Sequence, residues 1–267
     1  MKKVIGYKDR SEFYQFELVD TVDVPFIKSM INENTNKIME IPCGTGRIAF
    51  EIANANHLVT AADIEPEMVE QFTERLKNHR KKDYITAIVA DMCFFDFEDK
   101  FDLIVVPREA FQLITGYENA IKALKNMHKH LNYGGKIIID LFPFGAKIKP
   151  LTDIALRPDY YDYEIPDGKF VVDWSKEIEP WIVLTRLHGQ LHRSDCITEV
   201  TYRFQKNDQR NNTIFDDQIM TIELQNYTTE SFEKICDQAD VIVNKLYGNY
   251  ERKAYEPGDP RMLYVLT

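Results

Sequence analysis

The chain lacks the features of several common protein classes. No apolar run approaches the roughly 18 residues that a membrane span needs, and the longest candidate, 137–144, is interrupted by Asp140. The first residues, from Met1 to Lys8, contain no hydrophobic segment of the kind found in a secretory signal. We therefore expect a cytoplasmic protein with no membrane partner.

Cysteine is scarce and dispersed. The four cysteines form no CxxC pair, which fits a reducing compartment and argues against a disulfide framework or a zinc cluster. Histidine, cysteine and acidic residues show no ligand spacing, so we expect no metal site. Basic residues are outnumbered, 33 to 43, giving a net charge of −10. This balance argues against a nucleic-acid partner and favours a neutral or cationic one.

The first half of the chain alternates between two periodicities. Strand-like segments at 37–41, 57–64, 85–90, 101–106 and 136–141 are separated by helix-like segments, which include 47–55, 65–80 and 117–131. A further helical pattern covers 13–31, and we expect Pro25 either to break or to restart that helix. This alternation predicts an α/β fold, with a Rossmann-like, doubly wound parallel sheet and helices on both faces.

The alternation stops after about residue 150. Four consecutive strands are expected at 170–179, 181–188, 197–205 and 214–224, separated by turn-forming residues. A helix at 228–239 and strands at 241–246 and 262–266 follow. We therefore divide the chain into a core at 1–149 that includes an N-terminal helix, an antiparallel β insert at 150–226 and a C-terminal completion of the core sheet at 227–267.

A glycine-containing loop joins the first of these core strands to the next helix. Gly44 and Gly46 let the backbone approach a ligand closely because no Cβ intervenes. The next strand ends at Asp63, where an acid can accept hydrogen bonds from both hydroxyls of a ribose. The third strand ends at Asp91-Met92, which offers an acceptor and an apolar surface to an adenine. A nicotinamide cofactor is the alternative, with Ala49 at the third glycine position of its pattern.

These motifs together resemble those of class I S-adenosylmethionine-dependent methyltransferases. The resemblance is carried by EIPCGTGR at 40–47, Asp63-Ile64, Asp91-Met92, FDLIVV at 101–106 and Gly134-Gly135. It implies a seven-stranded sheet with the antiparallel insert between strands five and six, which suits the terminal hairpin better than a dinucleotide-binding sheet does. It also implies S-adenosylmethionine (SAM) as cofactor.

The resemblance further implies which residues hold the cofactor. Gly44 and Gly46 would lie under the methionine part, Asp63 would hold the ribose and Ile64 would pack on adenine. Glu40 would organise the loop or reach the cofactor amino group. Many family members have glycine where this chain has Pro42. The full implied cofactor set is Glu40, Pro42, Cys43, Gly44, Gly46, Arg47, Asp63, Ile64, Asp91, Met92 and Pro107.

Four residues are candidates for contact with the methyl acceptor. Related N-methyltransferases place an N-terminal tyrosine near the methyl group, and Tyr14 matches it best; alternatively it belongs to an ordinary core helix. Glu109 follows the fourth strand beside Arg108, where ligands of open sheets bind, although the two could simply pair with neighbours. Asp159 and Asp162 belong to an acidic, tyrosine-rich run at 157–164 that suits a cation, or that is an exposed turn.

Within the family, the chain is similar to two groups of N-methyltransferases. One comprises amino-sugar N,N-dimethyltransferases, and the other comprises plantazolicin-type enzymes that dimethylate the N-terminal arginine amine of a peptide natural product. We therefore predict methyl transfer to an amine of a small molecule or peptide. An O-methyltransferase and a non-catalytic methyltransferase-like subunit remain alternatives, and the oligomeric state is left open.

Overall fold

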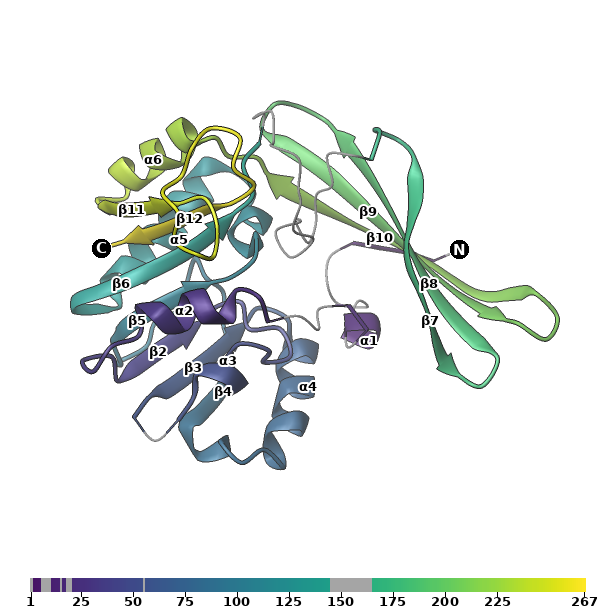
Figure 1. Cartoon of the computed structure of the whole chain (residues 1–267), viewed down its shortest axis with the longest axis horizontal. Helices are drawn as coiled ribbons and strands as arrows, with labels where there is room; N and C mark the ends of the chain where they lie inside the picture. Colours follow the sequence, from purple (N-terminus) through teal and green to yellow (C-terminus); the bar gives the residue numbers. More distant parts are fainter. Residues whose placement is uncertain (1, 6–10, 15, 18–20, 55, 145–164) are drawn as a thin grey trace.

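A seven-stranded sheet forms the core of the protein (Figure 1). The computed structural model describes residues 2–5, 11–14, 16–17, 21–54, 56–144 and 165–267. The strand order is β11-β12-β6-β5-β2-β3-β4, with β2 to β6 parallel and β12 and β11 each antiparallel to the neighbour. The strands are β2 (Lys37–Glu40), β3 (Leu58–Asp63), β4 (Ile85–Val89), β5 (Phe101–Val106), β6 (Leu131–Leu141), β11 (Val243–Tyr247) and β12 (Met262–Leu266). The predicted fold is confirmed.

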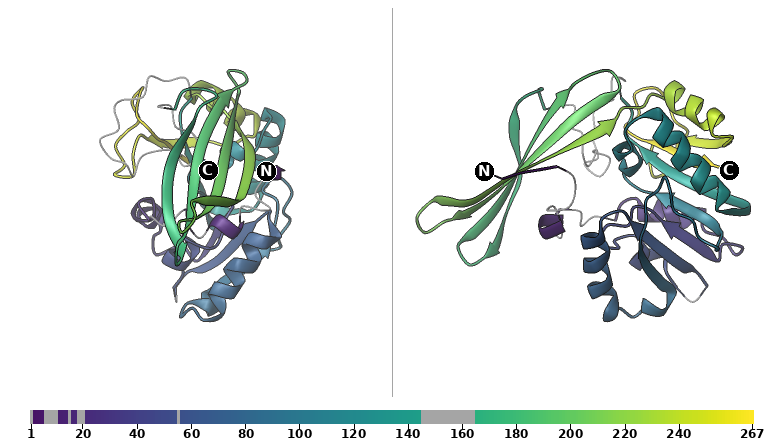
Figure 2. Two further views of the ribbon diagram at one scale, coloured as in Figure 1. Left: turned by 90° about the vertical axis from the view of Figure 1, so that its right-hand side faces the viewer. Right: turned by 180° about the vertical axis from the view of Figure 1, so that it is seen from behind.

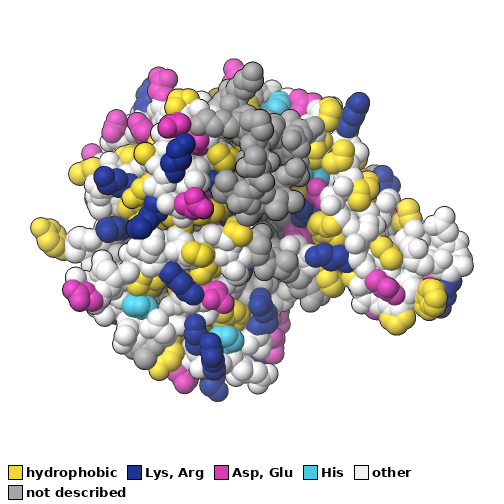
Figure 3. All heavy atoms as spheres, viewed as in Figure 1, with side chains coloured by type: hydrophobic (Ala, Val, Ile, Leu, Met, Phe, Trp, Pro, Cys, Tyr) yellow, Lys and Arg dark blue, Asp and Glu magenta, His cyan; other side chains and the backbone are white. Residues whose placement is uncertain are grey.

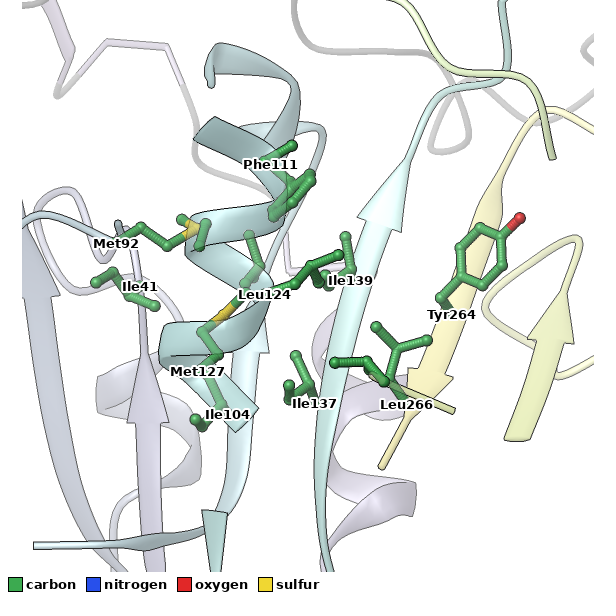
Figure 4. Packing of buried hydrophobic residues seen from close by; sticks show 14 of the residues in the cluster. Ile41, Met92, Ile104, Phe111, Leu124, Met127, Ile137, Ile139, Tyr264 and Leu266 are labelled. Carbon is green, nitrogen blue, oxygen red and sulfur yellow. The ribbon is translucent and has the colours of Figure 1, made fainter. Parts of the chain in front are cut away.

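Helices cover both faces of this sheet because its strands are apolar on both sides. Along β5, Leu103 and Val105 face one buried cluster and Ile104 and Val106 face the other, as the alternation of a strand requires. Met127 of α5 packs near Ile104 in the second cluster (Figure 4). The first cluster includes α2 (Val24–Met30), α3 (Ala49–Ile52) and Phe72 of α4 (Pro66–Lys77), and the second includes α5 (Tyr117–Lys129) and α6 (Thr229–Gln238).

The N-terminal helical pattern is divided. Within and beside 13–31 the structure has α1 (Ser11–Tyr14) and, further on, α2 beginning at Val24. Pro25 lies in the first turn of α2, where its missing N–H costs no intrahelical hydrogen bond. The proline therefore starts a helix, which is one of the two effects predicted for it.

The insert forms a second sheet, in the order β1-β10-β9-β8-β7. Its strands β7 (Phe170–Glu179), β8 (Ile182–His192), β9 (Ile197–Asp208) and β10 (Thr213–Gln225) are antiparallel neighbours. They lie in sequence between β6 and β11, the fifth and sixth core strands, as predicted. The sequence did not reveal β1 (Lys2–Ile5), which pairs in parallel with β10 and so brings the N-terminus into the insert.

The insert sheet is long, twisted and projects away from the core (Figures 1 and 2). One of its faces, here called the inner face, carries a buried cluster that includes Leu184, Val200, Tyr202 and Phe204. Phe13 of α1 belongs to this cluster. The N-terminal segment therefore packs on the insert as well as leading into the core.

A buried glutamine ties the insert to the core. Gln112 lies in the short 3₁₀ turn η2 (Ala110–Leu113) that follows β5. Its side-chain oxygen accepts a hydrogen bond from the Phe142 N–H at 2.8 Å, and its Nε2 donates to the Gln225 carbonyl at 3.2 Å. Gln225 in turn accepts from the Gly116 N–H at 2.9 Å. These bonds fix the end of β10 beside the ends of β5 and β6.

The surface carries mixed charge. On the core face seen in Figure 3, Lys, Arg, Asp and Glu side chains are interspersed. Such mixing is typical of an ordinary solvated surface. Among the described residues, no helix has the length and apolar character needed to cross a membrane.

Candidate active site

A pocket opens at the carboxyl ends of β2, β3, β4 and β5. Its volume is about 990 Å³, with the open solvent at its mouth included. In a parallel sheet the loops that follow these strands meet at one edge, so they all contribute to one wall. The lining residues are Tyr14, Glu40, Ile41, Pro42, Cys43, Gly44, Arg47, Asp63, Ile64, Glu65, Met68, Ala90, Asp91, Met92, Pro107, Arg108, Ala110, Leu113 and Ile114.

The structure brings together all but one of the eleven predicted cofactor residues. Gly46 is the exception, since it does not line the pocket. A Cβ at Gly46 would lie 2.2 Å from the Phe72 ring, and the residue has φ +87°. Gly46 therefore allows helix α4 to pack against the loop. Binding by the other ten residues stays a prediction.

Asp63 holds the glycine loop from the neighbouring strand. Its Oδ2 accepts a hydrogen bond from the Gly44 N–H at 2.8 Å, and its Oδ1 accepts from the Glu65 N–H at 3.0 Å. Burial raises the pKa of Asp63, while these backbone donors lower it. Each carboxylate oxygen retains a second lone pair. Asp63 can thus fix the loop and still accept hydrogen bonds from a ligand.

Glu40 is buried beneath the same loop. Its Oε2 accepts a hydrogen bond from the Ala49 N–H at 2.8 Å, at the start of α3. Burial raises the pKa of Glu40 to about 8, although Arg47 and the Ala49 N–H act in the opposite direction. Arg47 itself makes a bidentate ion pair with Asp23, at 2.5 and 2.8 Å. Glu40 therefore organises the loop, as one of its two predicted roles requires.

The wall at β3 and β4 combines an apolar surface with an acid. Ile64 is 56% exposed even though it is aliphatic, and it lines the pocket directly after Asp63. Asp91 lines the pocket from the loop after β4, and its Oδ1 accepts a hydrogen bond from the Cys93 N–H at 2.7 Å. Met92 completes this wall. An exposed aliphatic side chain beside a carboxylate suits a flat ring that bears an amino group.

Tyr14 of α1 contacts the glycine loop at Gly44. The Cβ that Gly44 lacks would lie 2.7 Å from the Tyr14 hydroxyl oxygen, and Gly44 has φ +52°. The absence of a Cβ at Gly44 therefore leaves room for the Tyr14 hydroxyl. The structure thus puts this N-terminal tyrosine on the pocket wall, and its catalytic role stays a prediction.

The two charged residues after β5 have different surroundings. Arg108 lines the pocket, whereas Glu109 does not and is 1% exposed. Glu109 pairs with the buried Arg261, which also pairs with Asp140. Arg108 and Glu109 both have positive φ, 41° and 55°. Glu109 is thus placed to support this turn from behind, and the pocket-facing member of the pair is Arg108.

Other candidates lie elsewhere or were missed. Asp159 and Asp162 lie outside the described residues. Glu65, Met68, Leu113 and Ile114 line the pocket and were not singled out. Glu65 and Met68 lie two and five residues after Asp63, where β3 ends and α4 begins. Their closeness to a strand end could have marked them as pocket residues. Leu113 and Ile114 had no such signal because they follow an irregular turn.

The described residues fit S-adenosylmethionine. Four acids line the pocket against two arginines, and one of these, Arg47, is already paired with Asp23. An excess of acids suits a ligand that carries a sulfonium and an ammonium. Asp63 offers acceptors for a ribose, and Ile64 with Asp91 offers a surface and an acceptor for adenine. Among the described residues no cluster of His, Cys, Asp and Glu has metal-binding geometry.

Comparisons with known proteins agree with this geometry. Residues 38–135 match the family model described as a methyltransferase domain. A ubiquinone/menaquinone biosynthesis C-methyltransferase from Geobacter sp. (strain M21) is 30% identical over 117 residues, 42% of this chain and 48% of that protein. A cypemycin N-terminal methyltransferase from Streptomyces sp. is 27% identical over 103 residues, 39% of this chain and 40% of that protein. The match thus spans half or less of each curated relative.

Solved structures extend the likeness of fold to the whole chain. The CcbJ methyltransferase from Streptomyces caelestis superposes with a TM-score of 0.74 at 13% identity, covering 97% of this chain and 96% of that one. The sugar N-methyltransferase KedS8 from Streptoalloteichus sp. gives 0.71 at 16% identity, covering 96% and 92%. At these identities the likeness shows a shared fold, insert included. Residues 38–135 thus match a methyltransferase domain, and the chain as a whole has the fold of these solved methyltransferases.

Proposed function

We propose that the whole chain transfers methyl groups from SAM to an amine of a small molecule or peptide. One observation carries this proposal: a pocket fitted to SAM opens beside Tyr14 and η2, next to an insert that the cofactor alone does not need. Because the insert packs on Phe13, the neighbour of the pocket-lining Tyr14, we propose it as the place of acceptor recognition.

The charge of the chain supports an amine acceptor. Its net charge is −10, a balance that favours a cationic partner. The sequence at 157–164 is rich in acids and tyrosines, which pair with ammonium or guanidinium. We therefore propose a cationic acceptor, of which an N-terminal arginine amine is one form and an amino sugar another. The cypemycin protein is named as an N-terminal methyltransferase and KedS8 as a sugar N-methyltransferase, and both names support this choice.

The residues of the chain would act by binding and alignment. When bound, SAM supplies an electrophilic methyl group on its sulfonium. Asp63 and Asp91 would hold the nucleoside, and Glu40 would hold the loop around the amino-acid part. Tyr14 lies against Gly44, where its hydroxyl can orient an acceptor nitrogen. An amine attacks only when neutral, so nearby carboxylates or water would take its proton.

An O-methyltransferase is the second candidate and has less support. Removing a hydroxyl proton needs a strong base near the methyl group, for which histidine is the usual side chain. No histidine lines the pocket among the residues that the structure describes. A non-catalytic subunit is the third candidate, and absence of SAM binding would support it.

Mass spectrometry after incubation with SAM tests the proposal. Two acceptors are offered separately: a short azole peptide with an N-terminal arginine, and a nucleotide-linked amino sugar. Gain of two methyl groups by the peptide alone supports arginine dimethylation, and gain by the sugar alone supports amino-sugar methylation. Methylation of neither amine, by a protein that binds SAM in calorimetry, contradicts both acceptor choices.

A further inference from the structure

The segment that carries Tyr14 is held by the insert on one side and meets the cofactor pocket on the other. The Phe13 ring stacks on Phe204 of β9, with centroids 4.4 Å apart and planes 9° from parallel. Phe13 is 2% exposed. The next residue, Tyr14, lines the pocket. Adjacent residues thus join the inner face of the insert to the cofactor site.

Arg186 of β8 makes a polar contact with this segment. Its Nη1 lies 3.2 Å from Oε2 of Glu17, and its Nε donates to Oδ2 of Asp173 at 2.9 Å. The Glu17 side chain is 1% exposed. The guanidinium also lies over the rings of Trp174 and Tyr202, at 5.6 and 4.9 Å from their centroids. A guanidinium fixed by stacking and by two carboxylates is well preorganised.

A tight turn transmits these contacts to Tyr14. The Glu17 N–H donates to the Tyr14 carbonyl at 3.1 Å, and the Phe16 N–H donates to the Phe13 carbonyl at 2.9 Å. Lys176 of β7 donates to the Phe16 carbonyl. Three insert strands therefore hold the residues on either side of Tyr14. The tyrosine hydroxyl then lies against Gly44, at a place where the side chain of any other residue at position 44 would collide with it.

We infer that the insert clamps Tyr14 over the cofactor pocket and that Arg186 is the positioning residue of this clamp. The inference rests on the proposed use of the pocket for SAM. With Arg186 in place, Tyr14 covers the bound cofactor and slows its escape. The insert thus controls how long the cofactor product, S-adenosylhomocysteine, stays bound, in addition to any contact that it makes with the acceptor.

Loss of Arg186 should release the clamp. Arg186→Met keeps most of the apolar stem but leaves the buried Glu17 carboxylate without this cation, which strongly disfavours its present position. We expect S-adenosylhomocysteine to dissociate from the full-length variant at least tenfold faster than from wild type, measured by stopped-flow displacement. Glu17→Gln should act in the same direction, and Arg186→Lys should restore part of the wild-type rate.

Arg203→Met is the matched control. Arg203 lies on β9 between Tyr202 and Phe204, so it points away from the inner face. It makes a bidentate pair with Asp217, at 2.8 and 2.6 Å. Its removal deletes an ion-paired arginine from the same sheet without touching the clamp. We expect no change in the dissociation rate.

A double variant separates positioning from general damage. If Arg186 acts through Tyr14, then Arg186→Met/Tyr14→Ala should dissociate no faster than Tyr14→Ala alone. If the two substitutions instead multiplied each other's effects on the dissociation rate, the inference would be overturned. A dissociation rate of Arg186→Met equal to that of Arg203→Met would also overturn it. Failure of every amine to be methylated would leave these rates unchanged, so the proposed acceptor class and the clamp fail by different results.

Discussion

The core and the insert place their functional residues by different means. In the core, Glu40, Asp63 and Asp91 each stand at or just after the end of a parallel strand, so order along the chain becomes position around one pocket. In the insert, Arg186 meets Glu17 across most of the length of the chain. The comparison teaches that a parallel sheet makes a site readable from its strand ends, whereas the contact between the insert and the N-terminal segment joins residues that are remote in sequence.

The largest expected effect tests how the core pocket is supported. Arg261→Met removes a fully buried cation and leaves Asp140 and Glu109 without it. Breaking a buried pair in this way costs about 3–5 kcal/mol, so urea denaturation should show a fall of that size in the free energy of unfolding. Arg210→Met, which breaks an exposed pair with Asp208 on the insert, should leave the midpoint unchanged. Equal urea midpoints for Arg261→Met and Arg210→Met would contradict the expected difference between the buried and the exposed ion pair.

Asp63→Ala should have the next largest effect. It removes the acceptor of the Gly44 N–H as well as the proposed ribose ligand. Losing charge-assisted hydrogen bonds of about 1.5–3 kcal/mol each predicts at least a ~100-fold loss of affinity for S-adenosylhomocysteine. Calorimetry measures it, with Asp63→Asn expected to be intermediate. An unchanged affinity would remove the ribose assignment.

Gly46→Ala tests whether Gly46 is needed for helix α4 to pack against the loop. The added Cβ would meet the Phe72 ring at 2.2 Å, whereas Gly134, which also has positive φ, has no atom within 4 Å of such a Cβ. Both substitutions strain the backbone, but only the first overpacks the core. We expect Gly46→Ala to lose about 2 kcal/mol more stability than Gly134→Ala in thermal unfolding. Equal losses would show that the clash is relieved at no cost.

The smallest effect concerns the charge of Glu40. Since burial raises its pKa to about 8, the carboxyl is largely protonated at pH 6.5. The ammonium group of bound S-adenosylhomocysteine favours the ionised form of Glu40, so binding releases a proton below pH 8 and affinity rises with pH. We expect S-adenosylhomocysteine to bind about three- to tenfold more tightly at pH 8 than at pH 6.5. Glu40→Gln should flatten this slope, and an identical slope would exclude Glu40 as its source.

The sequence predicted most of the core because its signals are local. Strand ends at Asp63 and Asp91 located the pocket, and the helix predicted at 228–239 is α6, which begins with a capping box between Thr228 and Ser231. These features depend on residues close in sequence, so periodicity and turn chemistry expose them. The seven-stranded sheet and the place of the insert followed from the same signals.

The rest depended on contacts that no local pattern encodes. The pairing of β1 with β10, the backing of Glu109 by Arg261 and the clash that excludes a side chain at Gly46 each involve a partner far along the chain. Charge near a strand end pointed to Glu109, but tertiary pairing turned it away from the pocket wall. Only the three-dimensional structure distinguishes it from Arg108.

A crystal structure of the protein with bound S-adenosylhomocysteine tests the central claim most directly. We predict the ribose hydroxyls within about 2.5–3.0 Å of the Asp63 carboxylate, adenine against Ile64 and beside Asp91, and the homocysteine sulfur beneath the Tyr14 side chain. A ligand bound outside this pocket, or a pocket in which Asp63 and Tyr14 make no contact with it, would contradict the account.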